Sequence, residues 1–252
     1  MTYPRLKNPA NTPKIAAHRG ASIAQTENTI AAFDLAVATG ADAVELDIRW
    51  TADGKAIVYH DPLIMHDGVR VAVNKLTTAD FAAITARQGI AVPTLAEVLD
   101  WGKDKMPLVF DIKDTGHEEE LIAEVERYGF HPQSVFSSFR LTIVGKIKAR
   151  RSDWRAAWII GNTGGALVRQ LLSAPILTRA VRWGMDALHF HFSWITPGVL
   201  QRCHRENIEV AVWTVDRPEE IKRFTDLGVD TIITNVPDLA RKMLDRKTSS
   251  VT

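Results

Sequence analysis

Cysteine is nearly absent from this chain of 252 residues, which contains only Cys203. A single cysteine cannot form an intrachain disulfide, and such low cysteine usage fits a reducing compartment. Long apolar runs are missing as well, since no stretch approaches the roughly 18 apolar residues of a membrane-spanning helix. Residues 1–14 are polar and have no apolar core like that of a signal peptide. We therefore expect a soluble, cytoplasmic protein without stable membrane insertion.

An excess of either charge is also missing, because 31 basic residues are balanced by 30 acidic ones. This balance gives no electrostatic reason to expect nucleic acid or an anionic membrane as a partner. Basic residues gather in 146–155, which we interpret as the solvated surface of a helix. We predict a small-molecule substrate and no nucleic-acid partner, and the sequence leaves the oligomeric state open.

The chain does contain a regular alternation of short β-branched or aromatic runs with amphipathic segments. It predicts strands at residues 15–18, 43–50, 108–113, 134–139, 156–160, 187–192, 209–215 and 231–234. Helices are predicted at 26–39, 78–86, 95–101, 118–128, 142–150, 165–172, 197–206, 218–227 and from 237 onwards. The first helix is predicted to have Thr26 as its cap and Glu27 in its first turn.

Strands that alternate with helices form parallel sheets, and eight such units in about 250 residues fit a closed (β/α)8 TIM barrel. A composition that is 46% apolar is sufficient for one core, so residues 1–252 are predicted to form a single α/β domain. No Gly-x-Gly-x-x-Gly turn follows the first strand, which argues against an open dinucleotide-binding fold. After the second strand, residues 56–60 return from an Asp-Gly hairpin turn, and residues 62–92 form a small insertion.

His18 and His60 are the candidate catalytic residues. Two imidazoles can supply one acid and one base near neutral pH. Arg19, beside His18, offers a planar fork for phosphate oxygens. Glu45 and Asp47 are two residues apart, so on a strand they face the same way and can share a cation.

The pair Asp111 and Lys113 repeats this spacing of two residues. All of these candidates fall late in a predicted strand or directly after one. Active sites of (β/α)8 barrels lie at the carboxyl ends of the strands, so the candidates meet at one mouth of the predicted barrel. The pattern indicates metal-assisted phosphoryl chemistry.

These motifs resemble the glycerophosphodiester phosphodiesterase family, in its short cytoplasmic bacterial form, over nearly the whole chain. A single tripeptide would mean little, but the ordered series is specific. The matching segments are His18-Arg19-Gly20, Glu27-Asn28-Thr29, Glu45-Leu46-Asp47, Thr51-Ala52-Asp53-Gly54, His60-Asp61, Pro93-Thr94-Leu95, Ser138-Phe139, Trp213-Thr214-Val215 and Gly228-Val229-Asp230.

The resemblance implies a TIM barrel that hydrolyses glycerophosphodiesters to glycerol 3-phosphate and an alcohol, as part of lipid and glycerol metabolism. It also implies a divalent metal ion, Mg²⁺ or Ca²⁺. Residue by residue, it implies acid and base roles for His18 and His60, phosphate contacts for Arg19 and Lys113, and metal ligation by Glu45, Asp47 and Asp111. Glu27 is expected at the mouth near metal or substrate, and Trp213 is expected to form an apolar wall.

The chain departs from the family pattern at three places. Asp111 stands where the family usually has glutamate, and the usual arginine after His-Asp is absent, with Met65 and His66 in that neighbourhood. Asn235 replaces the usual aspartate after Thr234. None of these changes removes a catalytic group.

Two other functions remain open from the sequence. One is a phosphodiesterase on the same scaffold that cleaves lysophospholipids or phosphoinositides, which a wide apolar cleft formed by residues 62–92 would favour. The other is a non-catalytic barrel that has kept a phosphate pocket. His189 and His191 share one face of a predicted strand. If that face is the barrel interior, His191 could join the site, but we expect it to be a packed, hydrogen-bonded residue.

Overall fold

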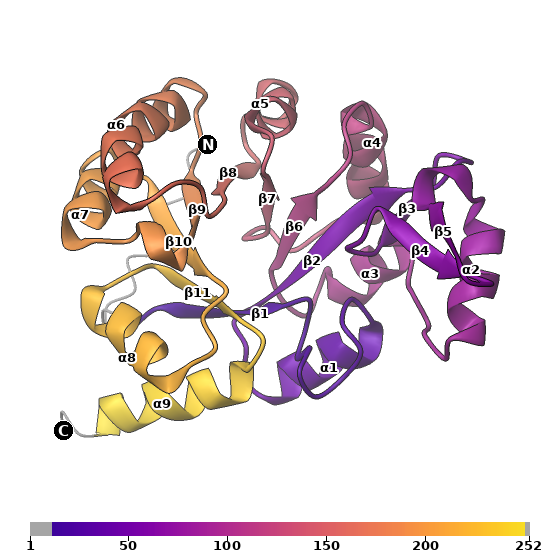
Figure 1. The fold of residues 1–252 in the computed structure, drawn as a ribbon, viewed down its shortest axis with the longest axis horizontal. Coiled ribbons are helices and arrows are strands. Elements are labelled where there is room, and N and C mark those ends of the chain that lie inside the picture. Colours follow the sequence, from indigo (N-terminus) through magenta and orange to yellow (C-terminus); the bar gives the residue numbers. More distant parts are fainter. Residues whose placement is uncertain (1–11, 250–252) are drawn as a thin grey trace.

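Eight parallel strands close into a barrel in the computed structural model, which describes residues 12–249 (Figure 1). The predicted (β/α)8 barrel is confirmed, because the strands follow one another around the ring and the last pairs again with the first. They are β1 (Lys14–His18), β2 (Ala43–Trp50), β6 (Leu108–Ile112), β7 (Val135–Ser138), β8 (Arg155–Ile160), β9 (Ala187–His191), β10 (Glu209–Trp213) and β11 (Thr231–Thr234). Residues 1–11, which include most of the polar amino-terminal segment, lie outside the described part.

Helices surround the ring of strands (Figure 1). They are α1 (Ile30–Ala38), α3 (Leu95–Gly102), α4 (Glu118–Tyr128), α5 (Leu141–Arg150), α6 (Ala166–Arg182), α7 (Pro197–Arg205), α8 (Pro218–Leu227) and α9 (Pro237–Ser249). Short 3-10 turns occupy Val73–Lys75 and Phe192–Trp194. Local sequence explains several starts: Thr94 and Glu97 form a reciprocal capping box at α3, and Thr196 caps α7 ahead of Pro197.

The predicted insertion projects to one side of the barrel (Figure 1). The short strand β3 (Ala56–Val58) first returns antiparallel to the end of β2. It is followed by a hairpin of β4 (Leu63–His66) and β5 (Val69–Ala72), and then by α2 (Thr78–Arg87). This hairpin was not predicted, although its turn is an Asp67-Gly68 pair in which both residues have positive φ angles.

The side chains of each barrel strand alternate between two environments. In β2, Val44, Leu46 and Ile48 belong to the core between strands and helices, whereas Ala43 belongs to the core inside the ring. Because side chains alternate along a strand, Glu45 and Asp47 share the inward direction of Ala43. The same alternation directs Asp111, Trp213 and His189 toward the barrel interior.

Two helix boundaries differ from the prediction by more than one residue. Helix α1 begins at Ile30 with Thr29 as its cap, so Thr26 is not the cap and Glu27 lies in the preceding loop. Asn28, at φ 57°, takes the left-handed conformation that a helix does not continue through. Helix α6 continues past Leu172 and across Pro175 to Arg182, where buried residues of its last turns pack against the barrel.

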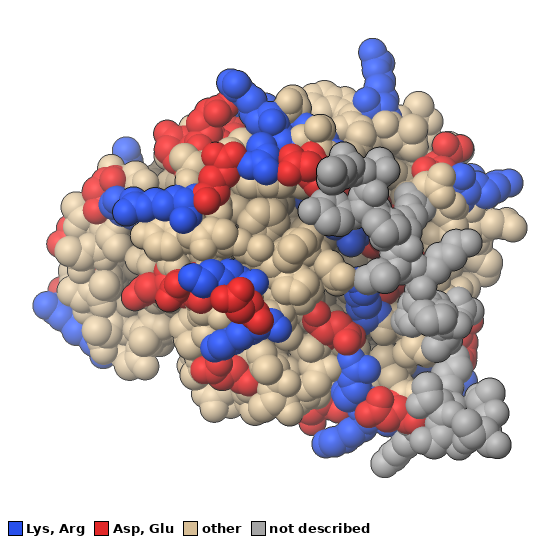
Figure 2. Space-filling view, turned by 180° about the vertical axis from the view of Figure 1, so that it is seen from behind, with Lys and Arg blue, Asp and Glu red and all other residues tan. Residues whose placement is uncertain are grey.

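Charges of both signs are mixed on the surface. Figure 2 shows basic and acidic side chains side by side on one face, which agrees with the net charge of +1. In the basic run 146–155, ion pairs join Lys146 to Glu118, Lys148 to Asp186, Arg150 to Glu119, Arg151 to Glu126 and Asp153, and Arg155 to Glu209. No helix within residues 12–249 is long and apolar enough to cross a membrane.

Candidate active site

A pocket of about 80 Å³ lies at the carboxyl ends of the barrel strands. Most of the residues predicted for the site line it, namely His18, Arg19, Glu45, His60, Asp111, Lys113 and Trp213. The two others are close by. Asp47 is 1% exposed and contacts Arg19 and Lys113, whereas Glu27 contacts Arg19 from the exposed loop before α1.

The turn after β1 brings Arg19 over the acidic residues. Arg19 has a φ angle of 59° and Gly20 one of 85°. A Cβ atom on Gly20 would lie 2.7 Å from the backbone of Ala32, so helix α1 can approach this turn only when glycine is present. The turn aims the backbone N–H of Arg19 at Glu45 Oε2, at a distance of 3.0 Å.

His18 is held in one orientation by an amide whose own orientation is fixed. Its Nδ1 atom lies 2.7 Å from Asn235 Oδ1, and Asn235 Nδ2 donates to Asp216 Oδ2 at 2.7 Å. Because the amide oxygen can only accept, Nδ1 carries the proton, and Nε2 of a neutral ring has a free lone pair. Burial and the neighbouring Arg19 guanidinium lower the pKa of His18.

His60 follows β3 and is about one-third exposed. Its Nδ1 atom lies 2.7 Å from the carboxylate of Asp61, and Arg49 Nε donates to its backbone carbonyl at 2.7 Å. The Asp61 carboxylate accepts a hydrogen bond from His60 Nδ1 and so holds the ring in one orientation.

Three buried carboxylates come together below the two histidines. Glu45, Asp47 and Asp111 each offer an oxygen, and these oxygens lie within 4.8 Å of one another. Burial and then repulsion from the other two carboxylates raise the pKa of Glu45 well above its ordinary range. Burial is also the main cause that raises the pKa of Asp111 to about 6.

Two cations partly neutralise this cluster. Lys113 Nζ lies 2.7 Å from Asp47 Oδ1 and also contacts Asp111 Oδ2. Arg19 Nε lies 3.1 Å from Asp47 Oδ2, and its Nη1 donates to both Glu27 oxygens at 2.9 Å. Burial alone would raise the pKa of Asp47, but Lys113 and Arg19 outweigh it, so the pKa is lowered.

The donor set fits a divalent cation such as Mg²⁺ or Ca²⁺. Both ions prefer carboxylate oxygens, and three are present in the cluster of Glu45, Asp47 and Asp111. In addition, Asp111 Oδ1 is buried and accepts no hydrogen bond from the described residues. A buried oxygen without a donor is costly, and a metal ion would satisfy it.

Aromatic side chains form the opposite wall of the pocket. The rings of Trp213 and Phe139 meet edge to face at 5.6 Å, and Trp213 Nε1 donates to the backbone carbonyl of His189 at 3.0 Å. Lys113 Nζ lies 5.6 Å from the centre of the Phe139 ring. His191 is packed edge-on against Trp213 and bonded to Ser193, as expected of a structural histidine.

Sequence reasoning did not assign roles to Asn28, Asn235 or Asp216. Asn28 Nδ2 donates to Asp47 Oδ2 at 2.9 Å, and its Oδ1 accepts the Asp47 backbone N–H at 3.2 Å. The sequence did mark two of these residues as unusual. Asn28 lies in the Glu-Asn-Thr motif, and Asn235 departs from the aspartate that is usual in the family. Nothing in the sequence indicates that Asp216 contacts Asn235.

The chain is similar to known proteins over most of its length. A sequence model of the glycerophosphoryl diester phosphodiesterase family matches residues 18–239. A glycerophosphodiester phosphodiesterase from Caldanaerobacter subterraneus is 32% identical over 240 residues, which cover 89% of this chain and 94% of the relative.

Solved structures show the same fold. The crystal structure of a glycerophosphodiester phosphodiesterase from Thermotoga maritima matches with a TM-score of 0.75 at 25% identity, over 92% of this chain and 98% of that one. A phosphodiesterase from Oleispira antarctica, solved in complex with its product sn-glycerol-3-phosphate, matches with a TM-score of 0.76 at 23% identity. That match covers 93% of this chain and 97% of the other.

Proposed function

Because this chain belongs to the glycerophosphoryl diester phosphodiesterase family, we propose that it hydrolyses glycerophosphodiesters to glycerol 3-phosphate and an alcohol with His18 and His60 as base and acid. The observation that carries this proposal is the pocket at the carboxyl ends of the strands. It combines two histidines, two cations and a buried carboxylate cluster around one space. The Oleispira antarctica protein of the same fold binds glycerol 3-phosphate as its product, which supports the same product here.

His18 acts as the base in this proposal. Its lowered pKa keeps the ring neutral near pH 7, and its Nδ1 proton is donated to Asn235. Nε2 therefore takes a proton from the nucleophile, which is either water or the 2-hydroxyl of the glycerol group. His60, oriented by the Asp61 carboxylate at Nδ1, gives a proton from Nε2 to the leaving alkoxide.

Arg19 and Lys113 bind the phosphate. Within residues 12–249, Glu27 and Asp47 occupy Nη1 and Nε of Arg19, which leaves Nη2 as its donor for a phosphate oxygen. Lys113 presents its ammonium group from between two carboxylates. The positive charges of Arg19 and Lys113 stabilise the transition state, in which negative charge is spread over the oxygens of the phosphoryl group.

Glu45, Asp47 and Asp111 would hold a divalent cation. When bound, such an ion supplies charge stabilisation to the phosphoryl oxygens. The carboxylates of this chain fix its position, because each is buried and Asp47 is further held by Asn28. Trp213 and Phe139 exclude water from the side of the pocket that faces the carbon skeleton of the substrate.

A second substrate class is favoured by the insertion. Leu63, Met65 and Val69 are 40%, 48% and 62% exposed on the β4–β5 hairpin, which begins three residues after His60 in the chain. Exposed apolar side chains on that hairpin favour substrates with an acyl chain, such as lysophospholipids. Comparing turnover of glycerophosphocholine with turnover of lysophosphatidylcholine distinguishes the two classes.

Release of choline and glycerol 3-phosphate from glycerophosphocholine tests the proposal directly. Hydrolysis that stops with a chelator and returns with added Mg²⁺ or Ca²⁺ is the expected result. Hydrolysis that is insensitive to the chelator would contradict the metal role. Absence of hydrolysis with every cation and both substrates would instead indicate a phosphate-binding barrel without catalysis.

A further inference from the structure

A second cavity lies at the opposite, amino-terminal end of the barrel. Its volume is about 50 Å³. The first residues of most barrel strands line it, namely Lys14, Ala43, Val135, Arg155, Ala187, Glu209 and Thr231. One water molecule needs roughly 10–15 Å³ of such volume, so the cavity has room for several waters or one small ion.

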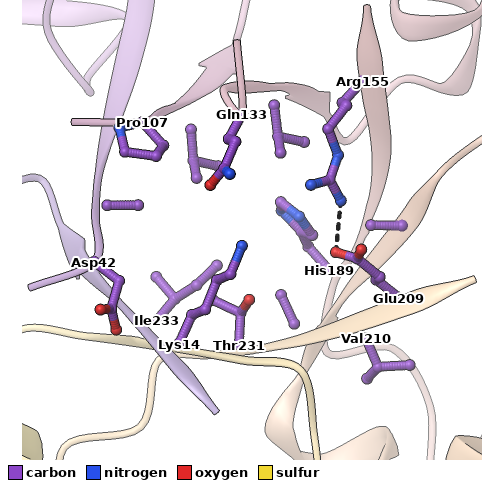
Figure 3. A pocket seen from close by; sticks show the side chains of 15 residues that line it. Lys14, Asp42, Pro107, Gln133, Arg155, His189, Glu209, Val210, Thr231 and Ile233 are labelled. Carbon is purple, nitrogen blue, oxygen red and sulfur yellow. Dashed lines mark hydrogen bonds and ion pairs between the residues drawn. The ribbon is translucent and has the colours of Figure 1, made fainter. Parts of the chain in front are cut away.

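Polar groups from β1, from the loop before β7 and from β9 point into this cavity. Figure 3 shows the Lys14 ammonium, the Gln133 amide and the His189 ring directed toward its centre. His189 is only 5% exposed. Among the hydrogen bonds within residues 12–249, Trp213 donates to the backbone carbonyl of His189 and none involves the His189 ring. Lys14 likewise has no ion-pair partner in that part of the chain. Buried or half-buried polar groups without protein partners are expected to find them in a bound molecule or in water.

The charges around the cavity leave a positive excess. Arg155 Nη2 lies 2.6 Å from Glu209 Oε2, so these two residues neutralise each other. Asp42 is bound to Arg241 at 2.7 Å and points away from the centre in Figure 3. Lys14 therefore contributes one uncompensated positive charge.

His189 contributes a hydrogen-bond donor and no charge. Burial, and then the nearby Arg155, lower its pKa to about 4, so the ring is neutral at pH 7 and carries a single N–H. An ammonium group, an amide N–H and the N–H of a neutral imidazole are all hydrogen-bond donors. Three donors around one cavity suit an anion with several oxygens, because each donor can bind a different oxygen of the same anion.

We propose that this cavity is a binding site for a small inorganic oxyanion, of the phosphate or sulfate class, held by Lys14, Gln133 and His189. The site is separate from the active site, since it lies at the other ends of the strands. His189 and Ile233 line both cavities and so form the partition between them. The proposal does not depend on the hydrolytic function.

Histidine NMR resonances locate anion binding at either end of the barrel. The protein is labelled with ¹⁵N-histidine, and chloride is replaced stepwise by inorganic phosphate at constant ionic strength and pH 7. The His189 resonance is identified as the one that is missing from the spectrum of His189→Gln. We expect a saturable shift of the His189 resonance. Shifts of His18 and His60 report phosphate in the active-site pocket. Because His189 lines that pocket as well, its shift is assigned to the amino-terminal cavity when its phosphate dependence differs from that of His18 and His60 and is weakened by Lys14→Met.

The variant Lys14→Met tests the contact with the anion. Loss of a charged donor is expected to weaken the phosphate affinity measured at His189 by roughly tenfold or more. Lys222→Met is the matched control, because Lys222 is an exposed residue of α8 paired with Asp226, and it should leave the affinity unchanged. Turnover of glycerophosphocholine should be unaffected in both variants, which shows that they are folded.

Two results would overturn the proposal. The first is a His189 resonance that shifts with neither phosphate nor sulfate, which would mean that the cavity holds water only. The second is an undiminished phosphate affinity in Lys14→Met. If Lys14→Met fails to fold, Gln133→Leu replaces it, and the same weakening is expected.

Discussion

The Nδ1 atom of His18 lies 2.7 Å from the amide oxygen of Asn235, a residue 217 positions away in the chain. The partner is neutral at a place where the family usually has a carboxylate. An amide oxygen orients the ring as a carboxylate would, but it adds no full negative charge to stabilise a protonated imidazole. Together with burial, this keeps His18 in the form of a base near neutral pH.

We expect Asn235→Asp to raise the pKa of His18, because an opposite charge at this distance favours the protonated ring by about one pH unit or more. If His18 is the base, the acidic limb of the kcat/KM profile moves to higher pH by the same amount. The pH dependence of glycerophosphocholine hydrolysis measures this shift.

Asp216 makes a sharper version of that experiment possible. Its carboxylate now accepts from the Asn235 amide at 2.7 Å and would repel an aspartate there. The double variant Asn235→Asp with Asp216→Asn restores a donor beside the new carboxylate, so its profile should shift as far or further. An acidic limb that stays in place in both variants would rule out His18 as the group that controls it.

Replacing either of the two histidines proposed as base and acid should abolish most turnover without unfolding the protein. His18→Ala and His60→Ala each remove one group of an acid–base pair, and we expect kcat to fall by at least about 100-fold. The matched control is His66→Ala, because His66 is a half-buried residue of the β4–β5 hairpin paired only with Asp67 among the described residues. Near-normal kcat in His18→Ala or His60→Ala would refute the assignment.

Much of the fold follows from short-range patterns in the sequence. Alternating strands and helices predicted the barrel, and a spacing of two residues predicted that Glu45 and Asp47 face the same way. Both patterns depend only on residues close together in the chain, so they can be recognised without knowing the tertiary structure. Because active sites of (β/α)8 barrels lie at the carboxyl ends of the strands, the sequence also predicted that strands distant in the chain, such as those that contain His18 and Asp111, meet at one mouth.

The contacts that orient the site could not be predicted in this way. Asn235 and Asp216 meet only because two strand–helix loops close over the same mouth, and side-chain orientation in loops has no period to detect. The start of α1 was misplaced for a similar reason. Thr26 is an acceptable cap by type, but the chain instead turns at Asn28, whose side chain binds Asp47 in a tertiary contact.

The carboxylate cluster predicts a loss of cation affinity when Asp111 is neutralised. Asp111→Asn removes one negative charge and replaces one of the two carboxylate oxygens by an NH₂ group, so we expect the Kd for Ca²⁺ or Mg²⁺ to rise by about tenfold or more. Isothermal titration calorimetry measures this without any substrate. Asp111→Glu keeps the charge and restores the longer side chain usual in the family, so it should retain much more affinity than Asn. Equal Kd values for wild type and Asp111→Asn would show that the cation is not bound here.

His189 predicts a specific dependence of stability on pH. Burial and Arg155 lower the pKa of His189 from 6.5 to about 4 in the folded state. Between these values the unfolded chain binds a proton that the folded chain does not, so stability is lost as the pH falls from 6.5 toward 4. The loss is about 1.4 kcal/mol for each pH unit within that window, and none is expected from this residue above it.

Chemical denaturation of the wild type and of His189→Gln isolates this contribution. Glutamine keeps a polar, uncharged side chain and cannot take up the proton, so the free energy of unfolding of the variant should fall less steeply between pH 6.5 and pH 4. Measurements in chloride buffer without phosphate or sulfate avoid added stabilisation from an anion at the amino-terminal cavity. Because all other titrating groups are common to both proteins, their effects cancel in the difference between the two curves. If the curves run parallel through this window, the buried ring of His189 is not held neutral by the barrel.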